Sequence, residues 1–387
     1  MINDVLKMYM NAEEQRQEAF LQMIASENFA SDAVRELTGS VFTNKYAEGY
    51  PGQRYYNGCE IYDDVESYAK VMLKEVYRCE YSNVQPHSGA NANLAAMTAL
   101  LNHGDKVLAM RLDHGGHLSH GAPVNISGSL YEFYHYGVND SGFLDYDQIE
   151  SQATQVKPKM IIAGASAYPR RIDWEKFREI ADKVGALLLV DMAHYSGLIA
   201  GGAYPSPIPH ADVVTSTTHK TLRGPRGGMI LWNDNTFTKK INSAVFPGTQ
   251  GGPLMNHVAA KAQCFYEASK EPFHLYSKAV VENARAMCDV FRERGIPLIT
   301  NGTDSHMILV DLSSRDIYGS DLADRLEMNL KIVVNKNGIP NDPNPPKYTS
   351  GIRIGTAAET TRGRTEQEFR NIATDISNTI DIMTREI

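Results

Sequence analysis

Three segments between residues 159 and 190 decide the fold: Lys159-Met-Ile-Ile-Ala163, Trp174-Glu-Lys-Phe-Arg-Glu-Ile-Ala-Asp-Lys-Val184 and Ala186-Leu-Leu-Leu-Val190. The first and third are short apolar runs, which are typical of buried strands. The middle segment has apolar side chains at helical spacing, and it is followed by Gly185, a residue type that commonly ends helices. The order strand, helix, strand predicts two parallel strands joined by a crossover helix.

Apolar runs on both sides extend this unit into a larger sheet. Further strands are predicted over residues 106–110, 211–215 and 228–232. Beyond about residue 270 the pattern predicts helices over 278–294, 322–330 and 366–384 and strands over 306–312 and 331–334. We therefore predict an α/β fold with a mostly parallel central sheet flanked by helices. Its expected parts are an N-terminal helical arm over 1–20, a large domain over 21–270 and a smaller α+β domain over 271–387.

The composition excludes several classes of function. Among 387 residues, 38 are Lys or Arg and 46 are Asp or Glu, a formal net charge of −8. This balance lacks the basic surface that nucleic-acid binding requires, and no apolar run approaches the ~20 residues that cross a bilayer. The four cysteines form no CxxC pair, and the polar N-terminus does not resemble a signal peptide. We expect reduced thiols, a cytoplasmic location, and neither a nucleic acid nor a membrane as partner.

Chemically competent side chains follow two of the predicted strands. Asp191 and His194 come after the strand that ends at residue 190, and His219 and Lys220 follow the strand that begins at residue 211. In open α/β sheets ligands lie beyond the carboxyl ends of the strands. A lysine amine and a carboxylate at one sheet edge fit pyridoxal phosphate, which needs a Schiff-base amine and an anion beside its ring nitrogen. A capping aspartate and a solvated lysine are the alternative.

A phosphate group requires hydrogen-bond donors, and one segment offers them. Ser88, Gly89 and Ala90 precede an apolar helix and would present backbone N–H groups at its N-terminus, where anions are favoured. A simple turn with a serine cap is the alternative. A second glycine-rich loop at residues 246–253 could also approach a phosphate, although by itself it indicates only a turn.

Three histidines at intervals of three, His114, His117 and His120, suggest a metal site. Gly115 and Gly116 between them indicate a loop, and no second cluster of ligand residues accompanies them. We predict no metal, and we expect one of these rings to stack on a planar cofactor.

Two further segments are candidates for binding a substrate. Residues 46–56 combine four tyrosines with Glu48 among helix-breaking residues, which indicates an exposed functional loop. Glu48 could transfer protons, or it could be an ordinary surface carboxylate. Arg353 lies within an apolar run, where a charge needs a partner. That partner is either a substrate carboxylate or an internal acidic residue.

The sequences of eight collinear motifs resemble those of the serine hydroxymethyltransferase family of fold-type-I pyridoxal-phosphate enzymes. The resemblance covers residues 13 to 380. The motifs are LQMIASEN (21–28), TNKYAEGYPG (43–52), VQPHSG (84–89), HGGHL (114–118), GASAY (164–168), VDMAH (190–194), TTHKTLRGPRGG (217–228) and SGIRIGT (350–356).

The resemblance implies a role for each residue of a cofactor site. Lys220 would form the Schiff base with pyridoxal 5'-phosphate, Asp191 would pair with the ring nitrogen, and His117 would stack on the ring. The implied catalytic residues are Lys220, Glu48, Asp191, His117 and His219. The implied cofactor-binding residues are Ser88, Gly89, Ala90, His117, Ser166, Asp191, His194 and Lys220, joined by Gly251 and Gly252 of a second subunit.

The resemblance also implies a substrate, a co-substrate and a partner. The amino acid would bind Ser26, Tyr46, Tyr56 and Arg353, and tetrahydrofolate would bind Tyr55, Leu112, Gly115, Leu118 and Asn337. Serine would be cleaved to glycine while its carbon passes to tetrahydrofolate. The tyrosines would arrive from a neighbouring chain, which implies a homodimer with shared active sites, or a tetramer built from it.

Several positions depart from the family pattern. Asn57 stands where relatives commonly have glycine, Ala357 where they often have proline, and Lys347 where a phenylalanine is usual near the expected folate pocket. These changes leave open a specialised paralogue that acts as an aldolase, transaldolase or hydroxymethyltransferase on another β-hydroxy or α-methyl amino acid without folate. A catalytically silent protein of the same fold is a further alternative, against which the intact Lys220 and Asp191 argue.

Overall fold

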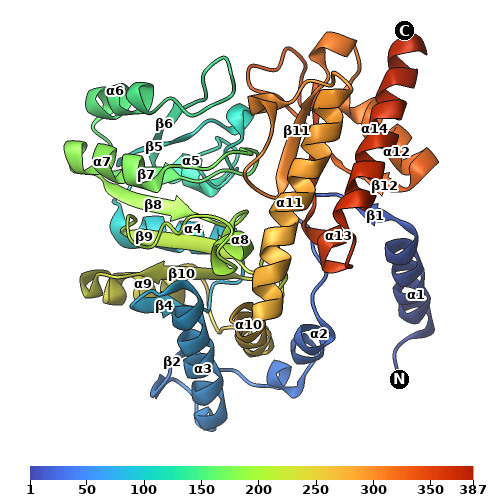
Figure 1. Ribbon diagram of the computed structural model, residues 1–387. Helices are drawn as coiled ribbons and strands as arrows, with labels where there is room; N and C mark the ends of the chain where they lie inside the picture. The colour runs from blue at the N-terminus through green and yellow to red at the C-terminus, as the bar shows by residue number, and fades with distance from the viewer. Residues whose placement is uncertain (387) are drawn as a thin grey trace.

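The computed structural model describes residues 1–386, and a seven-stranded sheet forms its centre (Figure 1). The strand order is β4-β10-β9-β8-β7-β5-β6. Strand β10 pairs antiparallel with β4 and with β9, whereas the other four pairings are parallel, so the predicted mostly parallel sheet is confirmed. The strands are β4 (Tyr81–Asn83), β5 (Lys106–Met110), β6 (Glu132–Tyr136), β7 (Met160–Ala163), β8 (Leu187–Asp191), β9 (Val213–Thr217) and β10 (Gly228–Trp232).

The segment that predicted the fold forms the expected strand–helix–strand unit. Helix α7 (Trp174–Val184) joins β7 to β8, and Gly185 ends it in the left-handed conformation at φ 68°. The Asp173 side chain caps its first turn by accepting a hydrogen bond from the Lys176 N–H. Strand β9 begins two residues later than predicted, and just before it the Asp212 carboxylate accepts hydrogen bonds from the Leu188 N–H and from Arg178.

Alternating side chains of the sheet bury two separate apolar layers. Leu188 and Val190 point into one layer, whereas Leu189 belongs to the other. Helices on both faces complete these layers, which is why the strands are apolar at nearly every position. The helices of this region are α3 (Glu60–Tyr77), α4 (Gly89–Leu100), α5 (Ile126–Leu130), α6 (Tyr146–Val156), α7, α8 (Ser196–Ala200), α9 (Thr238–Ser243) and α10 (Met255–Ala268).

The C-terminal region has a sheet and an apolar core of its own. Strands β11 (Met307–Asp311), β14 (Gly351–Gly355) and β13 (Asn335–Asn337) form an antiparallel sheet in that order. Helices α12 (Gly319–Leu330) and α14 (Glu366–Glu386) contribute Leu322, Leu326, Phe369 and Ile376 to its core. The short helix α13 (Ala357–Thr361) follows β14 directly.

Helix α11 (Glu271–Glu293) connects the two regions (Figure 1). Phe273 and Val280 near its start pack into the core of the large sheet, whereas Met287 and Phe291 pack into the C-terminal core. The boundary that we placed at residue 270 therefore precedes a helix shared by both cores, and the three-part division stays a proposal.

The N-terminal segment lies against the C-terminal region before it reaches the large sheet. Helix α1 (Asp4–Ala19) has no buried residue, and strand β1 (Leu21–Gln22) pairs in parallel with β12 (Ile332–Val333). Helix α2 (Asp32–Thr38) and the hairpin of β2 (Gly49–Tyr50) and β3 (Gln53–Arg54) follow. None of the helices among residues 1–386 combines the length and the apolar character that a membrane span requires.

Candidate active site

One cavity of about 460 Å³, which we call the cofactor cavity, lies where the ends of β8 and β9 meet the start of α4. Eleven of the predicted site residues line it: Ser26, Ser88, Gly89, Ala90, His117, Ser166, Asp191, His194, His219, Lys220 and Arg353. They come from segments spread over more than three hundred positions of the chain, and the fold brings them to one place.

Lys220 is the amine of this cavity. Its side chain is buried, with 9% of the residue exposed. Burial lowers the pKa of Lys220 to about 8; Asp191 opposes the shift, and the neighbouring Arg353 and Arg226 add to it. A substantial fraction of this amine is therefore neutral near physiological pH, which is the form that attacks an aldehyde.

Asp191 provides a buried negative charge at the end of β8. Its Oδ2 atom accepts hydrogen bonds from Asn93 Nδ2 at 2.8 Å and from His120 Nε2 at 2.9 Å, and its Oδ1 atom accepts one from the Ala193 N–H at 3.0 Å. Burial by itself would raise the pKa of Asp191, but the hydrogen bond from His120 and the nearby imidazoles lower that pKa well below its usual range. The carboxylate is therefore ionised and able to hold a cationic ring nitrogen.

Two of the three histidines, His117 and His120, lie close to Asp191. His117, His120 and Asp191 have potential ligand atoms within 4.8 Å of one another. However, His120 Nε2 is already bonded to Asp191, and His117 Nδ1 is bonded to the Ser119 hydroxyl at 2.7 Å. Burial lowers the pKa of His117 to about 4, so its ring is neutral and suited to stacking. The absence of a metal stays a prediction.

The start of α4 fits a phosphate group. Ser88 caps the helix by accepting a hydrogen bond from the Asn91 N–H. Gly89 is packed so closely against β9 that a Cβ atom there would lie 2.6 Å from Thr217 Cγ2. The Thr217 hydroxyl is buried without a hydrogen-bond partner among the described residues, and Thr217 lines the cavity. A hydroxyl in this situation is suited to donating a hydrogen bond to an anionic ligand.

Arg353 is buried without an acidic partner. Its Nε and Nη2 atoms donate to Asn335 Oδ1 at 3.2 and 2.8 Å, and Nη1 donates to the Ser166 carbonyl at 2.6 Å. Within residues 1–386 no carboxylate forms an ion pair with Arg353. The alternative that an internal acidic residue is the partner of Arg353 is therefore wrong. Burial lowers the pKa of Arg353 to about 10, which shows how incompletely its charge is compensated.

The residues predicted to come from a second subunit lie outside this cavity and beside one another. We call residues 46–56 the tyrosine loop. The rings of Tyr46 and Tyr56 are 5.5 Å apart, and a Cβ atom at Gly251 would lie 3.5 Å from Glu48 Oε1. A Cβ atom at Gly252 would meet Tyr46 and Glu48 at 3.1 and 3.5 Å. Tyr55 packs on Phe246 of the same glycine-rich segment.

The predicted folate residues are spread around the site. Leu112 and Leu118 are exposed, and Leu112 lines a surface cavity of about 370 Å³ that shares His117 with the cofactor cavity. Gly115 is buried, and it is packed so closely that a Cβ atom there would lie 2.6 Å from the Ala167 carbonyl oxygen. Asn337 lies in β13 and donates a hydrogen bond to the Gly338 carbonyl.

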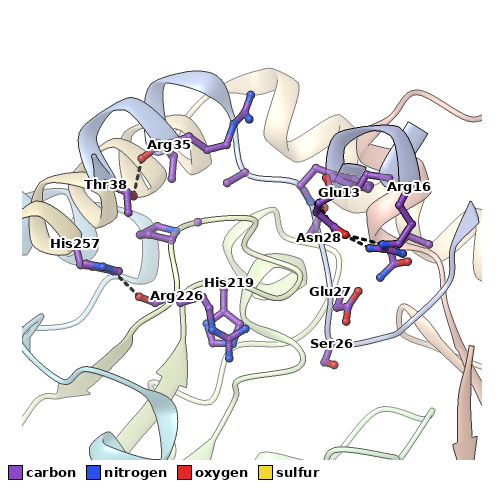
Figure 2. Close-up of a pocket in the computed structure, with 17 residues that line it drawn as sticks. Glu13, Arg16, Ser26, Glu27, Asn28, Arg35, Thr38, His219, Arg226 and His257 are labelled. Carbon is purple, nitrogen blue, oxygen red and sulfur yellow. Dashed lines mark hydrogen bonds and ion pairs between the residues drawn. The ribbon is translucent and has the colours of Figure 1, made fainter. Parts of the chain in front are cut away.

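A larger cavity of about 790 Å³ shares part of its lining with the cofactor cavity, and Figure 2 shows the residues that line the larger cavity. Glu13 and Arg16 of α1 border it on one side, and Arg35 and Thr38 of α2 border it on another. The two cavities share Ser26, Glu27, His219 and Arg226.

Sequence reasoning missed Asn93, His120 and Thr217 as members of this site. Asn93 and Thr217 stand within the quoted motifs or next to them, but only the tertiary structure shows that they face the same cavity.

Comparison with known proteins yields one family. A sequence model described as "Serine hydroxymethyltransferase" matches residues 2–376. The protein with that name from Marinobacter nauticus is 57% identical over 373 residues, covering 96% of this chain and 89% of the relative. The one from Psychrobacter cryohalolentis is 57% identical over 378 residues, 97% and 90% of the two chains. The one from Legionella pneumophila is 54% identical over 381 residues, 98% and 91%.

Proposed function

Because the chain belongs to the serine hydroxymethyltransferase family, we propose that it interconverts serine and tetrahydrofolate with glycine and 5,10-methylenetetrahydrofolate. The observation that carries this proposal is the convergence of a buried amine, an ionised carboxylate and an unpaired guanidinium around one cavity. Pyridoxal 5'-phosphate, when bound there, supplies the electron-accepting ring that makes cleavage of the Cα–Cβ bond possible.

The residues of the cavity divide the binding of the cofactor among them. The backbone N–H groups of Ser88, Gly89 and Ala90 and the free hydroxyl of Thr217 are placed to bind the phosphate. Asp191 holds the proton on the ring nitrogen, because Asn93 and His120 keep the carboxylate ionised. We assign His117 to one face of the ring, and Ser166, His194 and His219 to its other contacts.

The amino-acid substrate is oriented by its carboxylate. No acidic side chain within residues 1–386 forms an ion pair with Arg353, and Ser26 lines the same cavity. Lys220 Nζ, whose pKa lies near 8, can release a proton and take it back at neutral pH. We therefore assign Arg353 and Ser26 to the substrate carboxylate, and Lys220 to proton transfer at the reacting carbon.

We infer that the active site is completed by a second copy of the chain. Glu48, Tyr46 and Tyr56 lie together but do not line the cavity of their own Lys220. The larger cavity adjoins Ser26 and His219, so there is room beside the site for the tyrosine loop of a neighbour (Figure 2). On this proposal Glu48 handles protons of the hydroxyl or folate, Gly251 and Gly252 complete the phosphate site, and the enzyme is a cytoplasmic homodimer or a tetramer of such dimers.

Subunit mixing tests the shared site. Lys220→Ala and Glu48→Gln subunits are each expected to be nearly inactive as homodimers. After random reassortment about a quarter of the sites should regain activity, because half of the dimers are mixed and each mixed dimer has one intact site. A mixture that stays inactive although mixed dimers have formed would show that Glu48 acts within its own chain.

Substrate tests separate the main proposal from the paralogue. Serine cleavage should depend strongly on tetrahydrofolate, whereas α-methylserine and threonine should be poor substrates. Cleavage of one of those amino acids without folate, faster than that of serine, would select the specialised paralogue. Lys347 would then explain the loss of folate dependence.

Borohydride reduction of the holoenzyme should leave the cofactor attached at Lys220 alone, and Lys220→Ala should lack both the adduct and the visible absorption.

A further inference from the structure

A second lysine, Lys261, is buried outside the cavity. It lies on α10 with 2% of its surface exposed. Its ammonium group donates hydrogen bonds to three backbone carbonyls, those of Val84 at 2.7 Å, Pro86 at 3.0 Å and Gly228 at 2.8 Å. An ammonium group has three N–H bonds. Each donor therefore has its own acceptor, and the arrangement requires the protonated form.

These carbonyls belong to the base of the turn that precedes α4. Val84 directly follows β4, and Pro86 stands two residues before Ser88. Gly228 is the first residue of β10; its N–H donates to the Pro86 carbonyl at 3.0 Å, and a Cβ atom there would lie 2.2 Å from the Ser88 carbonyl oxygen. Lys261 thus joins both sides of the turn that carries the proposed phosphate-binding amides.

The surroundings of Lys261 are shaped for it. A Cβ atom at Gly227 would lie 2.3 Å from Lys261 Cε, so a larger residue would displace the side chain. The Gln85 carbonyl, between the two that Lys261 binds, accepts a hydrogen bond from Gln250 Nε2 at 2.8 Å. Three consecutive carbonyls of this turn therefore each accept a hydrogen bond from a side chain.

Core stability does not explain a lysine at this position. Burial lowers the pKa of Lys261 to about 7, and the charge of Glu66 opposes the shift only in part. Burying an ammonium group without a carboxylate that neutralises it costs folding free energy, which the three hydrogen bonds to carbonyls offset. A role in positioning the turn gives a reason for this cost.

We propose that Lys261 is a positioning residue that fixes the turn at Val84–Ser88, so that the N–H groups of Ser88, Gly89 and Ala90 point at the phosphate of the cofactor. This inference rests on the proposed function, which places the phosphate at the start of α4. Lys261 itself touches neither the substrate nor the reacting atoms.

The test compares two ligands that differ only in the phosphate. Apoenzyme of the wild type and of Lys261→Met is titrated with pyridoxal 5'-phosphate and with pyridoxal, and the visible absorption gives each dissociation constant. We expect Lys261→Met to bind pyridoxal phosphate at least about tenfold more weakly, because charge-assisted bonds to the phosphate lose their geometry. Pyridoxal binding should change less than about twofold. Inorganic phosphate should also raise the melting temperature of the variant apoenzyme less than that of the wild type.

A matched control separates positioning from a general loss of stability. Asn283 is equally buried on α11, where its Nδ2 atom donates to the Thr360 hydroxyl. Asn283→Ala should lower stability without changing the ratio of the two dissociation constants. If Lys261→Met does not fold, Lys261→Gln, which offers two donors, is compared in the same way.

Two outcomes overturn the inference. Equal weakening of both ligands, or of neither, would show that Lys261 has only a structural role. A wild type that binds pyridoxal as tightly as pyridoxal phosphate would refute the phosphate site itself, and this result is distinguishable because it is seen before any substitution.

Discussion

Replacing Arg353 by lysine tests how the substrate carboxylate is recognised. A guanidinium group has five N–H bonds. Asn335 accepts from Nε and Nη2, and the Ser166 carbonyl accepts from Nη1. One N–H therefore remains on each terminal nitrogen, the pair that a carboxylate binds through two parallel hydrogen bonds.

The magnitude follows from this count. Arg353→Lys keeps the positive charge but can offer the carboxylate at most one bond in good geometry. Losing one charge-assisted hydrogen bond costs about 1.5–3 kcal/mol. The dissociation constant for serine or glycine should therefore rise about 10- to 150-fold, since 1.4 kcal/mol corresponds to about tenfold.

Spectroscopic titration of the holoenzyme with serine and with 2-aminoethanol, which lacks the carboxylate, measures this effect. Arg353→Lys should weaken serine but leave 2-aminoethanol unchanged. Arg170→Lys is the control, since Arg170 is a half-buried arginine that bonds Thr300 and Asp304 outside the cavity. Unchanged serine affinity in Arg353→Lys, or equal loss for both ligands, would refute the assignment.

Three further results are expected. The rate at which apoenzyme captures pyridoxal phosphate should rise with pH and level off above about 8, because the neutral amine of Lys220 reacts and its pKa is lowered to about 8. A rate that keeps rising until the pH reaches the ordinary pKa of lysine would contradict this. His120→Phe removes a hydrogen bond that keeps Asp191 ionised, so cofactor affinity measured by equilibrium dialysis should fall about tenfold or more. Glu359 is buried and accepts hydrogen bonds from Arg362, Arg364 and the Gln22 N–H. Glu359→Ala should therefore lower the free energy of unfolding, measured in urea, by about 3–5 kcal/mol. A loss below about 1 kcal/mol would mean that water replaces these bonds.

The sequence predicted candidate residues at strand ends, because apolar runs indicate where strands stop. Asp191 and Lys220 are such candidates, and both line the cavity. The partners that define their chemistry were not, since Asn93 and His120 reach Asp191 across 98 and 71 positions of the chain. Local patterns contain no information about such distant pairs.

Strand direction and buried lysines were missed for related reasons. Residues 228–232 have the same apolar pattern as the parallel strands, yet β10 runs antiparallel to β9. Burial on both faces determines that pattern, whereas direction depends on the connection that precedes the strand. Lys261 stands among alanines on a helix, where a lysine ordinarily indicates a solvated face. Its carbonyl partners come from two distant segments, so only the folded chain reveals its burial.

The charges around the cofactor cavity indicate what kind of ligands it accepts. Lys220, Arg226 and Arg353 line it, against Asp191 and the exposed Glu27, whose pKa is raised because its surroundings partly desolvate the carboxylate. The histidines do not add to the positive charge, because burial lowers the pKa of His117 to about 4 and that of His219 to about 3. The excess of positive charge favours ligands with more than one anionic group. On the proposed function, a cofactor phosphate at the start of α4 and a substrate carboxylate at Arg353 would satisfy this requirement together, with both ligands bound at the same time.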